Sequence, residues 1–324
     1  MANSKYVSKK DTSLYTVGFY NLENLFDTKN DPSTLDDDFL PTSEKRWNKK
    51  RYEKKIFKLG TTISNIGFHT SGKAPVIVGL AEVENRKVLE DLIASRHLIN
   101  KGYDLVHFDS PDERGIDVAL IYQKAFFEVI DVETIHVEVN NPNGEKDYTR
   151  DILRVSGMLN NEKVHVLVNH WPSRRDGAEK TSYKRIAAAQ KNREVIDIIR
   201  NKEGQEAKII VMGDFNDDPF DASVKHLAKS DLYNPMLQLL TRRQGSLSYR
   251  GAWNLFDQVL FSNSFHKYEK GTHSFSSAKI FDEDFLKVYK GRRKGTPFRT
   301  YAGRKYLGGY SDHFPVYVQL KLNA

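Results

Sequence analysis

The sequence predicts an α/β fold in one large domain, and three observations support this. Short apolar runs rich in β-branched residues recur along the chain and are typical of strands. Patterns long enough for helices lie between some of them. The 324 residues contain no internal repeat and no low-complexity linker. Near-continuous apolar strands that alternate with helices indicate sheets covered on their faces, which on this pattern alone favours a parallel arrangement.

The runs predicted to be strands are seven to nine residues long and rich in apolar or β-branched residues. They are 14–20 (LYTVGFY), 75–81 (PVIVGLA), 116–122 (IDVALIY), 163–169 (KVHVLVN), 207–213 (AKIIVMG), 255–261 (LFDQVLF) and 314–322 (FPVYVQLKL). Helices are predicted over 44–66, 86–96 and 182–200. The strongly basic part of the first helix, 44–58, is expected to be a solvated face.

Composition limits the chemistry available to the chain. Hydrophobic residues make up 39% and charged residues 29%, as in ordinary soluble domains. No stretch approaches about 18 uninterrupted apolar residues, so no membrane-spanning segment is predicted. Cysteine is absent, which excludes disulfides and thiolate chemistry. Any metal must therefore bind oxygen or imidazole, and oxygen ligands suit Mg²⁺, Mn²⁺ or Ca²⁺.

The net charge of +7 favours an anionic partner, although many proteins with other functions carry such a charge. The N-terminal stretch MANSKYVSKKDTS is polar and lacks the apolar core of a signal peptide. We expect residues 1–13 to be a flexible tail on a soluble protein, either cytoplasmic or exported with a signal peptide absent from this sequence. A monomer is expected, although nothing in the sequence fixes the oligomeric state.

Polar side chains of catalytic type stand at the ends of several predicted strands. A single acid after a strand is usually a cap or turn residue, but a cluster of buried carboxylates requires a cation. In α/β sheets ligands bind outside the strand ends. The residues concerned are Asn21, Glu82, His170, Asp214 and Asn216 after their runs, Asp312 and His313 before the last run, and Asp117 and Asp257 near the start of theirs.

The stretch VMGDFNDDPF at 211–220 is expected to contain core residues (Val211 and Met212), site residues (Asp214 and Asn216) and a turn (217–219). Alternation places Asp214 and Asn216 on one side while the chain remains extended. Asp217 and Asp218 are expected to cap the following turn or helix rather than to bind metal.

The motifs together resemble the endonuclease/exonuclease/phosphatase superfamily, in a bacterial branch, over roughly residues 14–322. They are NLEN at 21–24, AEVEN at 81–85, NHWP at 169–172, GDFN at 213–216, FDQV at 256–259 and SDHFPV at 311–316. The resemblance implies a DNase I-like four-layer sandwich, in which two packed mixed β-sheets are flanked by helices, in a single domain over 14–324. It replaces the parallel sheet that the strand pattern alone favours.

The same resemblance implies a Mg²⁺-dependent phosphoesterase that uses in-line attack by water, with Mn²⁺ or Ca²⁺ as alternative ions. Glu82 resembles the main metal ligand, and Asn21 and Asp312 would complete the ligand set directly or through water. Asp214 would orient and deprotonate the attacking water. Asn216 would hold water or a phosphate oxygen without adding negative charge.

Two imidazoles and two guanidinium groups complete the expected site. The resemblance implies that His313 pairs with Asp257 and His170 with Asp117. A carboxylate partner fixes the tautomer and favours the imidazolium, which can stabilise phosphate charge or protonate the leaving group. Arg150, in YTRDILRV, resembles an arginine that contacts substrate phosphate in DNase I, and Arg114 is a weaker candidate for the same role. Glu23 and Glu84 are expected to face solvent or to form hydrogen bonds rather than to ligate.

The substrate is predicted to be a phosphate-containing molecule, most plausibly DNA or RNA cleaved by an endonuclease or exonuclease. Basic loops at 172–185 and 288–310, the second mixed with Tyr and Phe, could read it or could be solvated loops. A phosphatase or phosphodiesterase acting on inositol phosphates, nucleotides or lipid headgroups remains an alternative. A catalytically inactive nucleic-acid-binding module is the alternative of another class, and the complete motif set argues against it.

Overall fold

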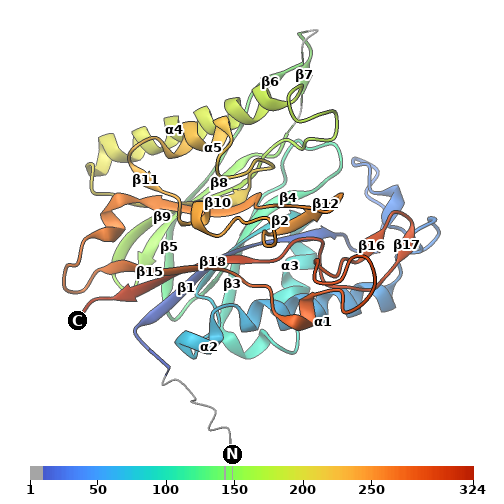
Figure 1. Ribbon diagram of the computed structural model, residues 1–324, viewed down its shortest axis with the longest axis horizontal. Helices are drawn as coiled ribbons and strands as arrows, with labels where there is room; N and C mark the ends of the chain where they lie inside the picture. Colours follow the sequence, from blue (N-terminus) through green and yellow to red (C-terminus); the bar gives the residue numbers. More distant parts are fainter. Residues whose placement is uncertain (1–9, 142–143, 148) are drawn as a thin grey trace, which may run out of the picture.

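In the computed structural model, which describes residues 10–141, 144–147 and 149–324, two six-stranded β-sheets pack face to face (Figure 1). The first sheet has the order β15 (His273–Ile280), β18 (Val316–Leu322), β1 (Leu14–Leu25), β2 (Ile77–Val83), β4 (Asp117–Gln123) and β3 (Tyr103–His107). The second has the order β11 (Leu232–Tyr233), β14 (Asp257–Ser262), β10 (Lys208–Asp214), β9 (Glu162–His170), β8 (Ile152–Leu159) and β5 (Phe127–Ile135).

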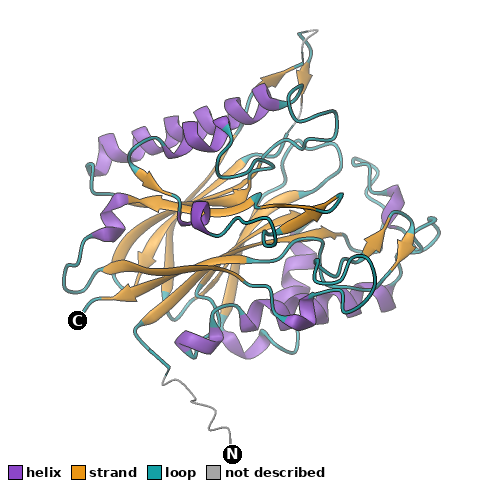
Figure 2. Cartoon of the chain, viewed as in Figure 1, coloured by secondary structure: helices purple, strands orange, loops and turns teal. Residues whose placement is uncertain are grey.

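Helices cover the outer face of each sheet, which gives four layers (Figure 2). On the first sheet lie α1 (Lys49–Asn65), α2 (Phe68–Ser71) and α3 (Arg86–Ile93), and on the second lie α4 (Ser182–Glu203) and α5 (Ala222–Ala228). Short 3₁₀ turns are η1 (Asp37–Phe39), η2 (Ile99–Lys101), η3 (Pro235–Gln238), η4 (Asn263–His266) and η5 (Asp284–Leu286). Small ladders join β6 (Val139–Asn140) to β7 (Lys146–Asp147), β12 (Leu247–Tyr249) to β13 (Ala252–Asn254), and β16 (Tyr301–Ala302) to β17 (Lys305–Tyr306).

Both six-stranded sheets are mixed. β1 and β2 are parallel, as are β9 and β10, and the other ladders of these two sheets are antiparallel. Each parallel pair is joined through a helical segment, because a parallel connection needs a crossover. The parallel sheet favoured by the strand pattern is therefore wrong, and the sandwich of two mixed sheets implied by the resemblance is confirmed.

The core is arranged in the same layers. Apolar side chains of both sheets, among them Phe19, Val166 and Met212, form one cluster between the sheets. A second cluster joins the outer face of the first sheet to α1 and α3. A third joins the outer face of the second sheet to α4 and α5. Burial on both faces explains the near-continuous apolar runs, which do not alternate as half-exposed strands do.

The seven predicted strands and three predicted helices are present, with shifted ends. The first helix begins at Lys49 rather than at residue 44, because the side chain of Asn48 caps it and accepts a hydrogen bond from Arg51 N at 3.2 Å. The sequence did not predict β3, β5, β8 and β15. β5 carries exposed acids, and β15 is mostly polar, so neither forms an apolar run.

The N-terminal expectation is only partly covered by the structure. Residues 1–9 of the predicted tail lie outside the described residues, while Asp11 N donates to Thr70 O at 2.9 Å. Within the described part of the chain, the search for a helix both long and apolar enough to cross a membrane finds none.

Candidate active site

The predicted site residues gather at one edge of the sandwich, where Asn21 on β1 lies beside the ends of β2 and β10 and the start of β14. Asn21 on β1 pairs with Ala81, the residue before Glu82 on β2. In the other sheet Asp214 ends β10, with His170 as its neighbour on β9 and Asp257 as its neighbour on β14. The alignment of strand ends in two packed sheets therefore builds the site, as expected for ligand sites beside strand ends.

Asn21 links the two sheets through its amide nitrogen. Asn21 Nδ2 donates to Asp214 Oδ2 at 3.0 Å and lies 3.3 Å from Glu82 Oε1. Its amide oxygen instead accepts from Glu23 N at 2.9 Å. In this arrangement Asn21 orients the two carboxylates, which favours an indirect relation to a metal ion over direct ligation.

Asp214 lies at the centre of the cluster and is almost fully buried. Its Oδ1 accepts from Asn216 N at 3.0 Å. Burial, together with the nearby charge of Asp257, raises the pKa of Asp214 to about 6. A carboxylate whose pKa lies this close to neutrality is a better proton acceptor than an ordinary aspartate.

His313 and Asp257 form the imidazole–carboxylate pair predicted from the sequence. His313 Nδ1 lies 2.6 Å from Asp257 Oδ2 and 4.0 Å from Asp214 Oδ2. Burial alone would lower the pKa of His313, but the charge and hydrogen bond of Asp257 outweigh it, and the pKa is raised well above 6.5. His313 is thus held as imidazolium.

The predicted pairing of His170 with Asp117 is wrong. His170 Nε2 lies 3.8 Å from Asp214 Oδ2, and its buried Nδ1 has no hydrogen-bond partner among the described residues. Burial and the charges of Arg150 and Arg114 hold the pKa of His170 well below 6.5, so this imidazole is neutral. The two histidines therefore differ in charge, whereas the sequence analysis expected two imidazolium groups.

Asp117, the first residue of β4 in the opposite sheet from His170, has other partners. Its Oδ1 accepts from the backbone and hydroxyl of Ser110, the backbone bond being 3.0 Å long, and its Oδ2 lies 3.4 Å from His107 Nε2. These contacts close the loop between β3 and β4. That loop carries Asp112 and Arg114, so Asp117 acts on the site through the loop.

Asn216 faces the site in a different backbone conformation from the extended one expected. Its φ is 50°, which lies in the left-handed region that few residues other than glycine and asparagine adopt. The turn directs Asn216 Nδ2 to the carbonyl oxygen of Trp171 at 3.0 Å. Phe215, between the two site residues, is buried against the ring of Trp171 with centroids 4.5 Å apart.

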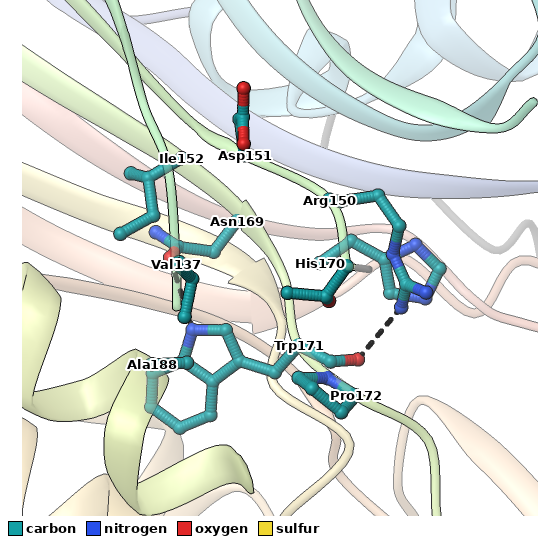
Figure 3. A pocket seen from close by; sticks show the side chains of 10 residues that line it. Val137, Arg150, Asp151, Ile152, Asn169, His170, Trp171, Pro172 and Ala188 are labelled. Carbon is teal, nitrogen blue, oxygen red and sulfur yellow. Dashed lines mark hydrogen bonds between the residues drawn. The ribbon is translucent and has the colours of Figure 1, made fainter. Parts of the chain in front are cut away.

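Arg150 is buried and held on two sides. Its Nη1 donates to Asp112 Oδ2 at 2.9 Å. Its Nη2 donates to the carbonyl oxygen of Trp171, also at 2.9 Å (Figure 3). Asp112 also lies 3.6 Å from Arg114 Nε, so one carboxylate holds both predicted phosphate contacts. Sequence reasoning missed Asp112, since an acid in a loop of the type SPDERG reads as a turn residue.

The acidic edge beside Asn21 fits a hard divalent cation. Glu82, half-buried with a φ of 61°, offers a carboxylate from a strained backbone, and strain of this kind is concentrated at functional sites. The charges of Asp312 and Glu82 both oppose the lowering of the pKa of Lys55 by burial, so both carboxylates act on the same buried lysine. Carboxylate oxygens are the ligands that suit Mg²⁺, Mn²⁺ or Ca²⁺.

Two groups of His and Asp residues also have ligand atoms close enough to hold an ion: Asp214, Asp257 and His313, and, apart from them, His107, Asp109 and Asp117. The first group is better suited to proton chemistry, because the imidazolium of His313 has no lone pair to offer a metal.

Glu84, which was not predicted to be a metal ligand, is buried and accepts a hydrogen bond from Asp27 N at 2.5 Å. Burial, with the charges of nearby aspartates, raises the pKa of Glu84 to about 8.

Glu23 and Lys55 form a buried network that the sequence did not reveal. Lys55 Nζ donates to Thr300 Oγ1 at 2.5 Å and to Tyr310 O at 2.6 Å, and lies 3.9 Å from Glu23 Oε2. Glu23 accepts from the backbone of Thr300 and Tyr301. The expectation that helix 44–58 presents a solvated face is wrong at Lys55, which is 2% exposed, while Lys49, Lys50 and Lys54 are exposed.

Asp217 and Asp218 do not take the predicted capping role, since the N-cap of α5 is Asp221, and their carboxylates instead contact distant parts of the chain. Asp217 Oδ1 forms ion pairs with Arg174 at 2.6 Å and Arg185 at 2.7 Å. Asp218 accepts from Leu255 N and from Asn254 Nδ2, both at 2.7 Å. Arg174 and Arg185 of the basic loop 172–185 thus stabilise the turn that contains Asn216.

Comparison with known proteins agrees with this geometry. A model of the "Endonuclease/Exonuclease/phosphatase family" matches residues 16–322. A D. rerio TDP2 humanised by 14 mutations superposes with a TM-score of 0.59 at 13% identity, covering 95% of this chain and 99% of that chain. The endonuclease/exonuclease/phosphatase from Bacteroides vulgatus gives 0.57 at 16%, covering 96% and 99%. The human Nocturnin catalytic domain with bound sulfate gives 0.55 at 16%, covering 96% and 94%. No curated protein matches the sequence.

Proposed function

The chain belongs to the endonuclease/exonuclease/phosphatase family, whose members are metal-dependent phosphoesterases, and we propose that it is a Mg²⁺-dependent nuclease acting on DNA or RNA. The observation that carries the proposal is the place of Asp214, between the two histidines and hydrogen-bonded to Asn21, which also lies beside Glu82. The proton acceptor Asp214, the positively charged His313 and the carboxylates that would hold a metal ion belong to one site.

Each residue receives one role in this proposal. Asp214 takes the proton of the attacking water, and His313, charged through Asp257, stabilises the negative charge that develops on the phosphate. Asn216, Arg150 and the neutral His170 donate to phosphate oxygens, since donors aimed at developing charge stabilise the transition state.

Glu82 and Asp312 would hold the divalent ion, which when bound would polarise a phosphate oxygen. Asn21 fixes the relative positions of the Glu82 and Asp214 carboxylates through the two hydrogen bonds of its amide nitrogen. Asp117 and Asp112 position Arg150 and Arg114. Arg150 and Arg114 differ in access, because Arg150 is buried and the side chain of Arg114 is 38% exposed. Arg114 therefore suits the part of the substrate that lies further out.

A nucleic acid as substrate is supported by charge. The net charge is +7, and the basic loop 288–310 leads directly to Asp312. Tyr289 in that loop is largely exposed, as a ring that stacks on unpaired bases would be. We expect a single domain over 14–324 that acts as a monomer.

A substrate panel tests the proposal. Plasmid, linear and single-stranded DNA, RNA, bis-p-nitrophenyl phosphate, p-nitrophenyl phosphate and inositol phosphates are incubated with Mg²⁺, with and without chelator. Cleavage of a nucleic acid that falls steeply as salt is raised supports the nuclease. Turnover confined to inositol phosphates or monoesters, or insensitive to salt, would replace it with a small-molecule phosphatase. Activity indifferent to chelation would remove the metal.

A further inference from the structure

Arg299 lies beside Asp312, one of the carboxylates that would hold the cation, a place called the metal edge below. It belongs to the segment between η5 and β16. Its Nη2 donates to Asp312 Oδ2 at 2.6 Å, and its Nε lies 3.6 Å from Glu23 Oε1. The side chain is 37% exposed and that of Asp312 is 30% exposed, so both can be reached from solvent. An arginine thus rests on one of the two carboxylates that would hold the cation.

The backbone on either side of this arginine is fixed. Thr300 N donates to Glu23 Oε2 at 2.5 Å and Tyr301 N to Glu23 Oε1 at 3.1 Å, while Lys55 holds the hydroxyl of Thr300. Gly309 N and Tyr310 N bond back to the carbonyls of Arg299 and Phe298. The neighbouring β16–β17 hairpin packs beside α1, where the guanidinium of Arg51 lies over the ring of Tyr306 (Figure 1). Only the guanidinium can therefore change partner without moving the loop.

The guanidinium and a divalent cation compete for Asp312. A carboxylate oxygen that binds a doubly charged ion loses most of its attraction for a neighbouring guanidinium, and the ion repels the arginine. Among the described residues, neither the buried Nε nor Nη1 of Arg299 has a hydrogen-bond partner. The guanidinium therefore has donors free to bind another group. Released from Asp312, it would present a planar fork beside the ion, the geometry that binds phosphate in a bidentate way.

We propose that Arg299 is a phosphate-binding residue that rests on Asp312 until a cation takes that carboxylate. The inference rests on the proposed function, because it assumes a phosphate ester at the metal edge. It adds a residue that links metal binding to substrate binding: the cation frees the arginine, and the arginine then holds the phosphate that the cation attracts.

The test measures metal affinity and substrate affinity separately in Arg299→Ala. Mn²⁺ binding, followed by the electron paramagnetic resonance signal of free Mn²⁺ without substrate, should tighten by about fivefold or more, because the competitor is gone. KM for bis-p-nitrophenyl phosphate should rise by about tenfold. Arg299→Lys should keep part of the competition and lose most of the gain in substrate binding, since an ammonium lacks the fork.

Arg96→Ala, an exposed arginine between α3 and η2, is the matched control and should change neither quantity. Weaker or unchanged Mn²⁺ binding in Arg299→Ala would overturn the inference, and so would an unchanged KM, because a merely structural arginine would weaken both affinities together. If the wild type binds Mn²⁺ and cleaves the diester, these results concern Arg299 alone. If the wild type does neither, the proposed function fails and this inference fails with it.

Discussion

Arg150 and Asn216 donate hydrogen bonds to one carbonyl oxygen, that of Trp171, from 2.9 Å and 3.0 Å. The two residues are 66 positions apart in the sequence (216 − 150), and the NHWP motif brings them together. Trp171 N in turn donates to Asp214 O at 2.9 Å, so the same residue is tied to the end of β10. The spacing between the two proposed phosphate donors is therefore set by a backbone atom, which no side-chain substitution removes.

Asp112→Asn should lower kcat/KM by about tenfold to 100-fold while the fold persists. The carboxylate is the buried ion-pair partner of Arg150, and loss of its charge leaves the guanidinium uncompensated and held chiefly by the bond from Nη2 to Trp171 O. Steady-state kinetics on a diester substrate check this, with circular dichroism for folding. Asp109→Asn, in the same loop but exposed, is the control. Equal activity of Asp112→Asn and wild type would show that Arg150 needs no help from Asp112.

Asp214→Asn should lower kcat by about 1000-fold or more without unfolding the protein. An amide keeps the shape and the bond to Asn216 N but cannot accept the proton of water. Relief of the repulsion with Asp257 opposes the loss of the hydrogen bond from Asn21 Nδ2, so the melting temperature should stay near that of the wild type. Single-turnover kinetics and a thermal melt provide both readouts, and Asp176→Asn, on an exposed loop, serves as control. Turnover near the wild-type rate would remove Asp214 from its role.

Asp257→Asn and His313→Ala should have similar effects, each lowering kcat by about 100-fold or more, and the double variant should be little worse than either. The reason is that Asp257 acts through His313, whose Nδ1 it holds at 2.6 Å. A double-mutant cycle measures the coupling, and NMR of the imidazole should show a lower pKa for His313 in Asp257→Asn. Additive losses would mean that the two residues act independently.

The sequence predicted the seven apolar strands, and its motifs indicated which residues to expect at the site, because both depend on local patterns. Apolar runs locate the buried strands, and the motifs GDFN and SDHFPV locate Asp214 and His313. Partners brought together only by the tertiary structure could not be predicted. Asp117 was paired with His170 from the strand pattern, but in the structure its carboxylate accepts hydrogen bonds from Ser110, seven residues earlier in the chain.

The same limit explains the errors at the basic segments. Lys55 reads as one more solvated lysine in KKRYEKKIFK, yet its partners Glu23, Thr300 and Tyr310 come from distant parts of the chain and make burial tolerable. Arg299 is one of several cations in its loop, and only the fold shows that this one meets Asp312. Spacing in sequence carries no information on which charge of a run finds an opposite charge.

Removal of divalent ions should abolish turnover, and Mg²⁺ or Mn²⁺ should restore it, because the proposed mechanism uses a cation held by Glu82 and Asp312. Glu82→Gln should weaken Mn²⁺ binding by about tenfold or more, since it removes a charged ligand from the edge. Calorimetric titration measures the affinity. Glu113→Gln, an exposed acid of the β3–β4 loop, is the control. Wild-type ion affinity in Glu82→Gln would place the ion elsewhere, for example at His107, Asp109 and Asp117.

Stability should fall on acidification through the neutral His170. Burial and the charges of Arg150 and Arg114 hold the folded-state pKa of His170 well below the ordinary 6.5, so the unfolded chain binds the proton first. The contribution of this group is therefore fully present above pH 6.5 and is lost as the pH falls below that value. His170→Gln should flatten the melting-temperature profile between about pH 7 and about pH 5, and the exposed His69→Gln should leave it as steep as in wild type. A profile equally steep in His170→Gln would assign the acid sensitivity to other groups and would show that His170 is not held neutral.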